Sequence, residues 1–423
     1  MATQSSVEVA KSEVQSTVIS NSKHILPIGI DLGTCYSRIA FWNDGGAHIV
    51  PFSGGRLYTH TCVTFTDDSV LLGDEAQELA FDERANAIYA PQRLIGDTVA
   101  NPWFQWFARM WPSRISRTKN DAPLILVNMN GEQKYLRPEE VLTLFLVHLR
   151  THAENFLNTE IKDVVVTIPS QLGMKQREAI VRAFAAARLQ VLGVLKSPTA
   201  SALAYTLTNR QRCHRNMMVF NIGGTYFDFA VLRIFGGHIV EDAVGTDVVD
   251  FDGALARFCV RDLAQKHSVS LPQCSTGFQR LRVACEQAKI KLSGAGHARI
   301  DISDIVPGVD YMISISRLLF EEVCKPELAR LLDSITCALG DITLQRNDID
   351  EVLLVGGLAR VPLFRRALRD FFHGRSCLEV MRPDHVAVLG ASAYAGLLDT
   401  THACAAELRH FEVTEVTATS TVV

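Results

Sequence analysis

The sequence predicts an α/β protein of two lobes, because one pattern of strand, glycine turn and strand occurs twice in its 423 residues. The first copy runs from Pro27 to Phe41 and the second from Met218 to Leu232. After each copy, β-branched apolar runs alternate with longer segments of helical periodicity, which is typical of sheets covered by helices. Two such halves facing each other predict a cleft between them.

The elements expected in the first half follow from short apolar runs and from helix signals. Pro138 is followed by two glutamates, which is a helix start, and Val141, Leu144 and Phe145 come next at near-helical spacing. We expect strands at Ile28–Ile30, Ser37–Phe41, His48–Pro51, Cys62–Phe65 and Asp163–Ile168, and helices at Pro138–Phe156 and Met174–Arg188.

The second half repeats this alternation after a polar, basic stretch at 208–216 that lacks periodicity. We expect a hairpin at Met217–Leu232, helices at Asp250–His267, Gly277–Leu292 and Arg317–Leu339, a β-rich piece at His297–Ser316 and a strand at Asp350–Val355. The predicted organisation is a disordered extension at 1–26, a first lobe at 27–212, a second lobe at 213–400 and a flexible tail at 401–423.

Composition excludes several classes of protein. A formal net charge of -4 gives no field that attracts nucleic acid or anionic lipid. The ten cysteines include no Cys-x-x-Cys pair and the thirteen histidines show no metal-ligand spacing, which favours reduced thiols and argues against a zinc site. Residues 1–26 lack an apolar signal core and no run approaches about 18 apolar residues, so we expect neither a signal peptide nor a membrane helix. We therefore expect a soluble cytoplasmic protein that binds neither nucleic acid nor membranes.

The two glycine turns are typical of phosphate binding. Glycines free a turn of side chains, so that backbone N–H groups line up towards a phosphate. Asp31 in the first hairpin and Asp228 in the second would hold a hydrated Mg²⁺ from both sides. The alternatives are that Asp31 hydrogen-bonds its own turn and that Asp228 is a solvated residue at a strand end.

Further segments, in order along the chain, carry a resemblance to a known family. They are residues 89–96, 164–169, 197–205, 281–293, 352–362 and 382–391. With the first hairpin they resemble the nucleotide-binding domain of the 70-kDa heat-shock chaperone (heat shock protein 70) family, within the actin and sugar-kinase ATPase superfamily. The resemblance covers about residues 27 to 400. It implies an actin-like ATPase fold, two lobes of duplicated mixed-sheet α/β domains around a nucleotide cleft that binds ATP or ADP with Mg²⁺.

The resemblance also implies which residues contact the nucleotide. Asp31 and Asp228 match the family's carboxylates around the metal ion. Glu286 and Lys289 match ribose and base contacts, although their spacing also suits an exposed helix ion pair, and Asp384 alternatively caps the helix that follows. The other matching positions are Gly33, Thr34, Cys35, Tyr36, Gly223, Gly224, Thr225, Tyr226, Ser293, Gly356, Gly357 and Arg360.

The sequence departs from the family where ATP is hydrolysed. Gln92 stands in place of a lysine that orients the attacking water, Ser197 in place of a glutamate, and Asn221 in place of an aspartate. Tyr226 replaces a small hydroxyl residue, and Asp247–Val249 replaces a pair of glycines. Neutral groups cannot stabilise developing charge, and one such loss lowers a rate by orders of magnitude. We therefore predict a pseudo-ATPase with weak or absent hydrolysis.

The predicted function is that of an ATP-binding protein with a role in chaperone-assisted protein folding. The sequence ends shortly after Leu398, so we expect no peptide-binding domain and no direct site for a peptide client. J-domain proteins, nucleotide-exchange factors or full-length chaperones are the expected partners. The alternatives are a working ATPase with substitute residues, a non-catalytic module that binds chaperone partners independently of nucleotide, and, with less support, a sugar kinase.

Overall fold

The structure is a computed structural model. It describes residues 27–43, 45–80, 86–108, 114–170, 172–209, 214–224, 226–273, 275–342, 344–375, 377–380, 382–399 and 411–415. The expected disordered extension at 1–26 lies outside the described residues, as do 401–410 and 416–423 of the expected flexible tail. Thr225 of the second glycine turn also lies outside them.

The first half is built on a six-stranded sheet with the strand order β12-β11-β1-β2-β3 and with β4 beside β2. Strands β1, β2 and β3 form an antiparallel meander, and β11 and β12 continue the sheet in parallel on the other side of β1. The strands are β1 (Ile28–Leu32), β2 (Tyr36–Asn43), β3 (Gly46–Ile49), β4 (Thr59–His60), β11 (Asp163–Ile168) and β12 (Gln190–Lys196).

The second half repeats this plan in a sheet with the order β19-β18-β13-β14-β15-β20. Again a meander, β13-β14-β15, is extended by two parallel strands, β18 and β19. The strands are β13 (Arg215–Ile222), β14 (Tyr226–Phe235), β15 (His238–Val248), β18 (Glu351–Val355), β19 (Cys377–Glu379) and β20 (Glu412–Thr414). The prediction of duplicated mixed sheets is therefore confirmed.

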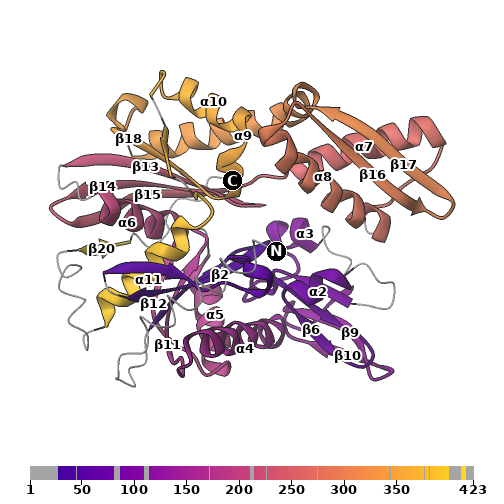
Figure 1. Ribbon diagram of the computed structural model, residues 1–423, viewed down its shortest axis with the longest axis horizontal. Helices are drawn as coiled ribbons and strands as arrows, with labels where there is room; N and C mark the ends of the chain where they lie inside the picture. The colour runs from indigo at the N-terminus through magenta and orange to yellow at the C-terminus, as the bar shows by residue number, and fades with distance from the viewer. Residues whose placement is uncertain are drawn as a thin grey trace, which may run out of the picture.

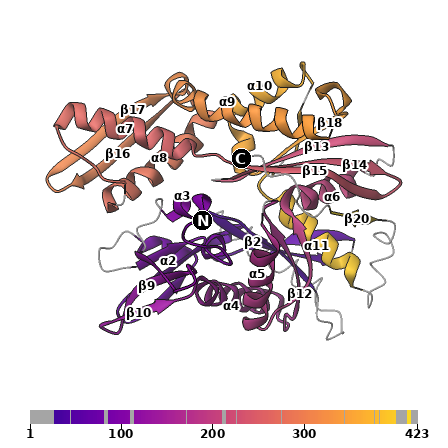
Figure 2. The ribbon, with the colours of Figure 1, turned by 180° about the vertical axis from the view of Figure 1, so that it is seen from behind.

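Helices pack around and between the two sheets (Figures 1 and 2). Helices α4 and α5 lie toward the lower edge of the molecule in these views, α9 and α10 lie along the upper edge, and α6 and α11 lie between the sheets. These helices are α4 (Pro138–Leu157), α5 (Met174–Ala186), α6 (Ser197–Asn209), α9 (Arg317–Asp341), α10 (Pro362–Phe371) and α11 (Val386–Leu398).

The two central helices cross over and join the halves. Helix α6 follows the first sheet but contacts β13 and β14 of the second, whereas α11 follows the second sheet but packs on β1 and β2 of the first. They also pack closely on each other, since a Cβ at Gly390 would lie 1.8 Å from the carbonyl oxygen of Ala200. No helix was predicted over α6, because small, hydroxyl and apolar residues are mixed along it and show no single hydrophobic face. The helix α11 was expected after Asp384 but without bounds.

Smaller elements form the outer part of each half (Figure 1). In the first half these are two three-stranded sheets, β6-β5-β7 and β10-β9-β8, and in the second half the hairpin β16-β17 packs on α8. The elements are β5 (Cys62–Phe65), β6 (Val70–Leu72), α2 (Asp74–Glu78), β7 (Asn86–Tyr89), α3 (Pro102–Ala108), β8 (Arg114–Arg117), β9 (Pro123–Met129), β10 (Glu132–Leu136), α7 (Phe251–His267), α8 (Thr276–Gly294), β16 (His297–Val306) and β17 (Val309–Ser316).

Most of the predicted elements are confirmed to within a few residues. The expected strand at His48–Pro51 is wrong by two residues, because β3 spans Gly46–Ile49. It starts directly after Gly45, whose φ of +76° suits a tight turn, and Pro51 has no N–H with which to continue a ladder.

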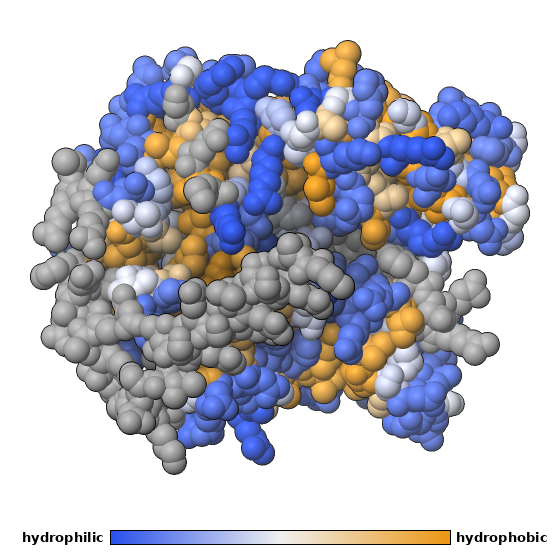
Figure 3. Space-filling view, in the orientation of Figure 1, coloured by the Kyte–Doolittle hydropathy of each residue, from blue (hydrophilic) through white to orange (hydrophobic). Residues whose placement is uncertain are grey.

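Each half has its own hydrophobic core. The core of the second half gathers around Phe220, Phe227 and Phe229 under α7, α8 and α9, and that of the first half around Phe41, Phe145 and Phe184. Tyr226 comes from the second half but packs with the core of the first. Hydrophilic side chains cover much of the face seen in Figure 3. Among the described residues no helix is long and apolar enough to cross a membrane.

Candidate functional site

The two glycine turns meet at the centre of the molecule. In the first hairpin, a Cβ at Gly33 would lie 2.3 Å from the carbonyl oxygen of Tyr36, so the turn between β1 and β2 requires glycine. In the second, a Cβ at Gly224 would lie 2.4 Å from the Sγ of Cys35. Burial, with a further contribution from Glu286, raises the pKa of the Cys35 thiol to about 12, so this thiol stays neutral and serves as packing. The missing side chain of Gly224 is what allows the two turns to touch.

A cavity of about 370 Å³ opens beside this contact, which is within the usual size of small-molecule sites. Nearly all of the predicted site residues line it. They are Asp31, Gly33, Thr34, Cys35, Tyr36, Ser197, Asn221, Gly223, Gly224, Tyr226, Asp228, Glu286, Lys289, Ser293, Gly356, Gly357, Arg360 and Asp384. Gln92 does not line the cavity and is buried beside the first turn. The ligand that the lining residues bind stays a prediction.

Asp31 is held from both neighbouring strands. Its carboxylate accepts a 2.6 Å hydrogen bond from the hydroxyl of Thr167, which lies directly across on β11. On the other side it lies 3.9 Å from a guanidinium nitrogen of Arg38, its partner on β2. Burial raises the pKa of Asp31 above its usual value, although Arg38 and the Thr167 bond act in the opposite direction. The carboxylate is thus engaged by side chains of β11 and β2.

Asp228 has a similar environment in the second hairpin. The hydroxyl of Thr246, directly across on β15, donates a 2.5 Å hydrogen bond to it, and the backbone N–H of Ser170 donates another of 3.3 Å. Only 3% of the residue is exposed, so it is not a solvated residue at a strand end. Burial raises its pKa to about 6, against the lowering effects of Thr246, Arg93 and Ser170.

These residues fit a directly bound divalent cation poorly. Mg²⁺ prefers an octahedron of oxygen ligands with one or two free carboxylates. Here both carboxylates already accept hydrogen bonds from threonines, Asn221 and Ser197 carry no charge, and a guanidinium faces Asp31. Within the described part of the chain, no group of three or more His, Cys, Asp or Glu side chains is arranged to hold a metal ion. The water-mediated role predicted for Asp31 and Asp228 stays a prediction.

The two neutral replacements near the turns bind backbone oxygens. The Nε2 of Gln92 donates to the carbonyl oxygens of Gly33 (2.9 Å) and Leu32 (3.4 Å), and its Oε1 is buried without a hydrogen-bond partner among the described residues. The hydroxyl of Ser197 donates to the carbonyl oxygen of Ile168 at 3.2 Å. Both side chains therefore support the shape of the cavity and bring no charge to it.

Arg93 is a site residue to which the sequence analysis gave no role. Its guanidinium donates two hydrogen bonds, of 3.2 and 3.0 Å, to the hydroxyl of Thr34 in the first turn. It also lies over the ring of Tyr226 at 3.4 Å from the ring centre, which is a close cation–π contact. Arg93 thus links the two turns. The sequence feature that could have pointed to Arg93 is its place next to Gln92, within the segment 89–96 that resembles the family.

Helix α8 provides a wall of the cavity. Glu286 accepts a 3.3 Å hydrogen bond from the hydroxyl of Tyr36, which reaches it from β2. Lys289 is 5% exposed and donates a 2.8 Å hydrogen bond to Asp252 of α7. Lys289 therefore makes a buried pair with α7, and the exposed ion pair within α8 considered above is not what the structure contains. Ser293 donates to the carbonyl oxygen of Lys289 at 3.2 Å.

Another part of the cavity wall contains Gly356, Arg360 and Asp384. Gly356 has φ of +88°, and a Cβ there would lie 2.3 Å from the carbonyl oxygen of Ile222, so glycine is required. Arg360 donates a 2.5 Å hydrogen bond to Asp384, which lies 3.3 Å from a second arginine, Arg38. Burial tends to raise the pKa of Asp384, but these cations lower it overall. Helix α11 is capped by the residue after Asp384 without a side-chain bond, so capping is not its role.

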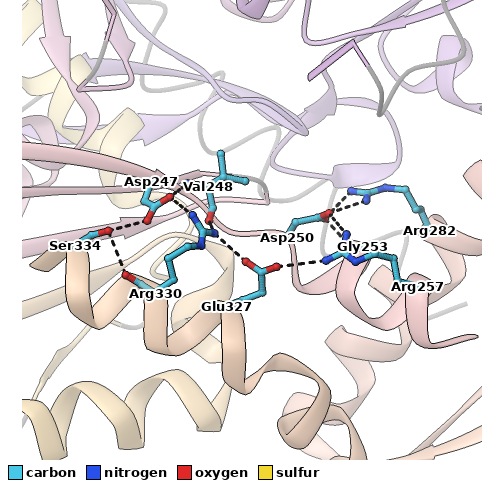
Figure 4. A network of polar contacts seen from close by, with 9 residues as sticks. All are labelled: Asp247, Val248, Asp250, Gly253, Arg257, Arg282, Glu327, Arg330 and Ser334. Atoms are coloured by element: carbon cyan, nitrogen blue, oxygen red, sulfur yellow. Dashed lines mark hydrogen bonds and ion pairs between the residues drawn. The ribbon is translucent and has the colours of Figure 1, made fainter. Parts of the chain in front are cut away.

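At the segment that replaces the family's glycine pair, a charged network fixes the backbone (Figure 4). Asp247 accepts hydrogen bonds from Ser334 (2.8 Å) and from Arg330 of α9. Arg330 also binds Glu327 at 2.8 Å, and through it the network reaches α7 and α8. In Figure 4 this chain of contacts continues through Arg257, Asp250 and Arg282. Side chains of α9 therefore hold the end of β15, and arginines of α7 and α8 hold Asp250 just after it.

Comparison with known proteins adds three findings. The family model described as Hsp70 protein matches residues 27–423. The chain is 34% identical over 380 residues to "Heat shock 70 kDa protein 2" of Paracoccidioides lutzii, covering 88% of this chain and 58% of that protein. It is 31% identical over 378 residues to "Heat shock cognate 70 kDa protein 3" of Dictyostelium discoideum, covering 88% and 60%. The chain thus spans about three-fifths of the length of these relatives.

Proposed function

Since the chain belongs to the heat shock protein 70 family, we propose that it binds adenine nucleotide in the central cavity and hydrolyses ATP slowly or not at all. Members of the family bind ATP or ADP with Mg²⁺, and they bind co-chaperones. The observation that carries the proposal is the meeting of the two glycine turns beside a cavity of about 370 Å³. Backbone N–H groups of such turns are ready-made partners for phosphate oxygens.

The base side of the cavity supports adenine as the ligand. Arg360 is half exposed at the cavity wall, where its planar guanidinium can stack on a base. Glu286 and Ser293 on α8 offer oxygens for ribose or base hydrogen bonds. Ile290, which is 54% exposed, adds an apolar surface beside them.

The phosphate side supports slow hydrolysis. A general base or a cation that positions the attacking water needs a free ionised group within hydrogen-bond reach. Gln92 and Ser197 are neutral and already donate to backbone oxygens. The burial of Asp228 raises its pKa to about 6, so part of it is protonated in weakly acidic solution. The catalytic unit of the family is therefore incomplete here.

A role in chaperone-assisted protein folding is part of the proposal. We propose that it acts together with J-domain proteins, nucleotide-exchange factors or full-length chaperones, because members of the family bind co-chaperones. A cytoplasmic location stays a prediction from the cysteine pattern.

A single-turnover experiment tests the proposal. Excess protein is mixed with labelled ATP and Mg²⁺, bound and free nucleotide are separated by gel filtration at a series of times, and the bound nucleotide is identified. We expect bound ATP that persists as ATP. Rapid appearance of bound ADP would overturn the slow-hydrolysis part and leave a working ATPase. Absence of bound nucleotide would overturn nucleotide binding and favour a module that binds chaperone partners independently of nucleotide.

A further inference from the structure

An arginine lies inside the cavity at a position to which the sequence analysis gave no role. Arg38 belongs to β2 and is the register partner of Asp31 across the first hairpin. Only 7% of the residue is exposed, and it contributes to the lining of the cavity. A buried arginine is rare unless its charge is used, because desolvation of an ion is costly. Its position therefore calls for a functional explanation.

The guanidinium of Arg38 lies between two carboxylates that line the cavity. One terminal nitrogen lies 3.9 Å from Asp31, beside the first glycine turn, and the other lies 3.3 Å from Asp384, beside Arg360. Its Nε is buried and has no hydrogen-bond partner among the described residues. The 3.9 Å separation from Asp31 is too long for a good hydrogen bond. Arg38 thus keeps donor capacity that its two carboxylate neighbours do not use.

The other cations that line the cavity also have partners, and Arg360 shares Asp384 with Arg38. Lys289 is bonded to Asp252 at 2.8 Å, and Arg360 is bonded to Asp384. Arg93 is bonded to Thr34 and stacked on Tyr226. What distinguishes Arg38 is its ion pair with Asp31, the carboxylate predicted to anchor the metal ion. A divalent cation at Asp31 would lie within a few ångströms of this fixed positive charge, and like charges at that distance repel strongly in a partly buried site.

We propose that Arg38 supplies the positive charge which a divalent ion supplies elsewhere, so that the cavity takes an adenine nucleotide as the free polyphosphate anion, with little dependence on Mg²⁺. This inference rests on the proposed function, because it concerns the same nucleotide. Arginine suits the task, since its planar fork binds phosphate oxygens in pairs and it stays charged at all relevant pH values. The second observation in its favour is that Asp31 and Asp228 fit a directly bound metal ion poorly, because both accept a hydrogen bond from a threonine and Asp31 also faces Arg38.

The test compares nucleotide affinity with Mg²⁺ and with EDTA. Binding of ADP and ATP to the full chain is measured by isothermal titration calorimetry in both solutions. For the unchanged protein we expect affinities that differ by less than about threefold between the two solutions. For Arg38→Gln we expect affinity in EDTA to fall by about tenfold or more, because a charge-assisted phosphate contact is lost. Arg38→Lys keeps the charge without the fork and should lose less.

The matched control is Arg299→Gln, which removes an arginine that is 61% exposed on β16, outside the cavity. It should leave both affinities unchanged. Nucleotide binding by the unchanged protein that falls by about a hundredfold in EDTA would overturn the inference while leaving the proposed function intact. Equal affinity of Arg38→Gln and the unchanged protein in EDTA would overturn it as well. A chain that binds no nucleotide in either solution would overturn the proposed function together with this inference.

Discussion

The two glycine hairpins share one backbone plan and differ in the charges that they present to the cavity. In the first hairpin Asp31 is paired across the strands with Arg38, and in the second Asn221 is paired at the corresponding position with Asp228. The carboxylate therefore lies on the first strand, β1, of the first hairpin and on the second strand, β14, of the second hairpin. The first hairpin adds a cation, and the second adds only a neutral amide.

The surroundings of the two carboxylates are nevertheless alike. Each accepts a hydrogen bond from a threonine directly across on the next strand, Thr167 for Asp31 and Thr246 for Asp228. The two carboxylates lie on strands that do not correspond, β1 and β14, so the supporting hydroxyl comes from β11 in one half and from β15 in the other. The two hairpins also differ in the residue paired with the carboxylate, and there the chain has changed the charge balance of the cleft.

The largest effect is expected from restoring the second hairpin and its neighbours to the family pattern. Together, Gln92→Lys, Ser197→Glu and Asn221→Asp return charged groups to the phosphate end of the cavity. We predict that single-turnover hydrolysis of bound ATP rises by about tenfold to a hundredfold, since members of one catalytic unit act jointly. The rate is measured from the conversion of bound labelled ATP to ADP after rapid mixing.

Two companion variants make this result interpretable. Asp228→Asn in the restored background should remove the gain, because it takes away the carboxylate retained by the second hairpin. Adding Arg38→Gln to the restored background should make the gain depend on Mg²⁺. If the triple variant binds ATP but hydrolyses it no faster than the unchanged chain, the substituted positions do not account for slow turnover.

A smaller effect, on stability, is expected from substituting the turn glycines, because the two turns leave different amounts of room for a Cβ atom. A Cβ at Gly33 would lie 2.3 Å from the carbonyl oxygen of Tyr36, whereas a Cβ at Gly223 would lie at an ordinary 3.6 Å from that of Tyr226. Gly33→Ala should therefore lower the free energy of unfolding by about 1–3 kcal/mol, and Gly223→Ala by less than about 1 kcal/mol. Denaturant unfolding of both variants measures the difference, and equal losses would contradict this account of the first turn.

Much of the fold was predictable because the duplicated pattern determines it. The hairpins at Ile28–Phe41 and Met217–Leu232 combine period-two strands with glycine turns, and long helices such as Met174–Ala186 have a clear apolar face. The crossover helix α6 was missed, and α11 was expected only as a helix of unstated length after Asp384, because burial between two sheets removes the amphipathic signal. Each of these helices packs on the sheet of the other half, and the periodicity of a single sequence does not reveal such tertiary contacts.

The site was predictable as a set of positions and not as a set of contacts. Motifs placed Asp31, Asp228 and Arg360 around one cavity, as the structure has them. Arg38 received no role, because it follows the turn inside an ordinary-looking strand and only the register shows that it faces Asp31. Lys289 was predicted to contact the nucleotide, with an exposed ion pair to Glu286 as the alternative, but it donates to Asp252, because a neighbouring helix offers a buried carboxylate.

The smallest effect concerns the outer edges of the two sheets. Strand β3 ends the order of the first sheet, whereas its counterpart β15 carries one more strand, β20, in parallel register. Glu415, next to β20, is 16% exposed and accepts a 2.6 Å hydrogen bond from the backbone N–H of Lys196. Burial raises the pKa of Glu415 from 4.5 to about 7, and the neighbouring Glu241 adds to this. The docked carboxyl thus holds its proton more firmly than a released one.

Because the pKa of Glu415 is higher in the docked state than in the released state, docking of β20 is predicted to weaken as pH rises. Below the ordinary pKa of about 4.5 both states are protonated and docking is strongest, and the advantage is lost as pH rises through about 7. Hydrogen exchange of the β15 and β20 amides at about pH 5 and about pH 8, corrected for intrinsic rates, should show protection that falls by several-fold. Glu415→Gln keeps an acceptor for Lys196 but cannot ionise, so its protection should not depend on pH in this range. An equal fall of amide protection in Glu415→Gln would mean that a group other than Glu415 makes the docking of β20 depend on pH. The extra strand of the second sheet would then not carry the pH response proposed for it.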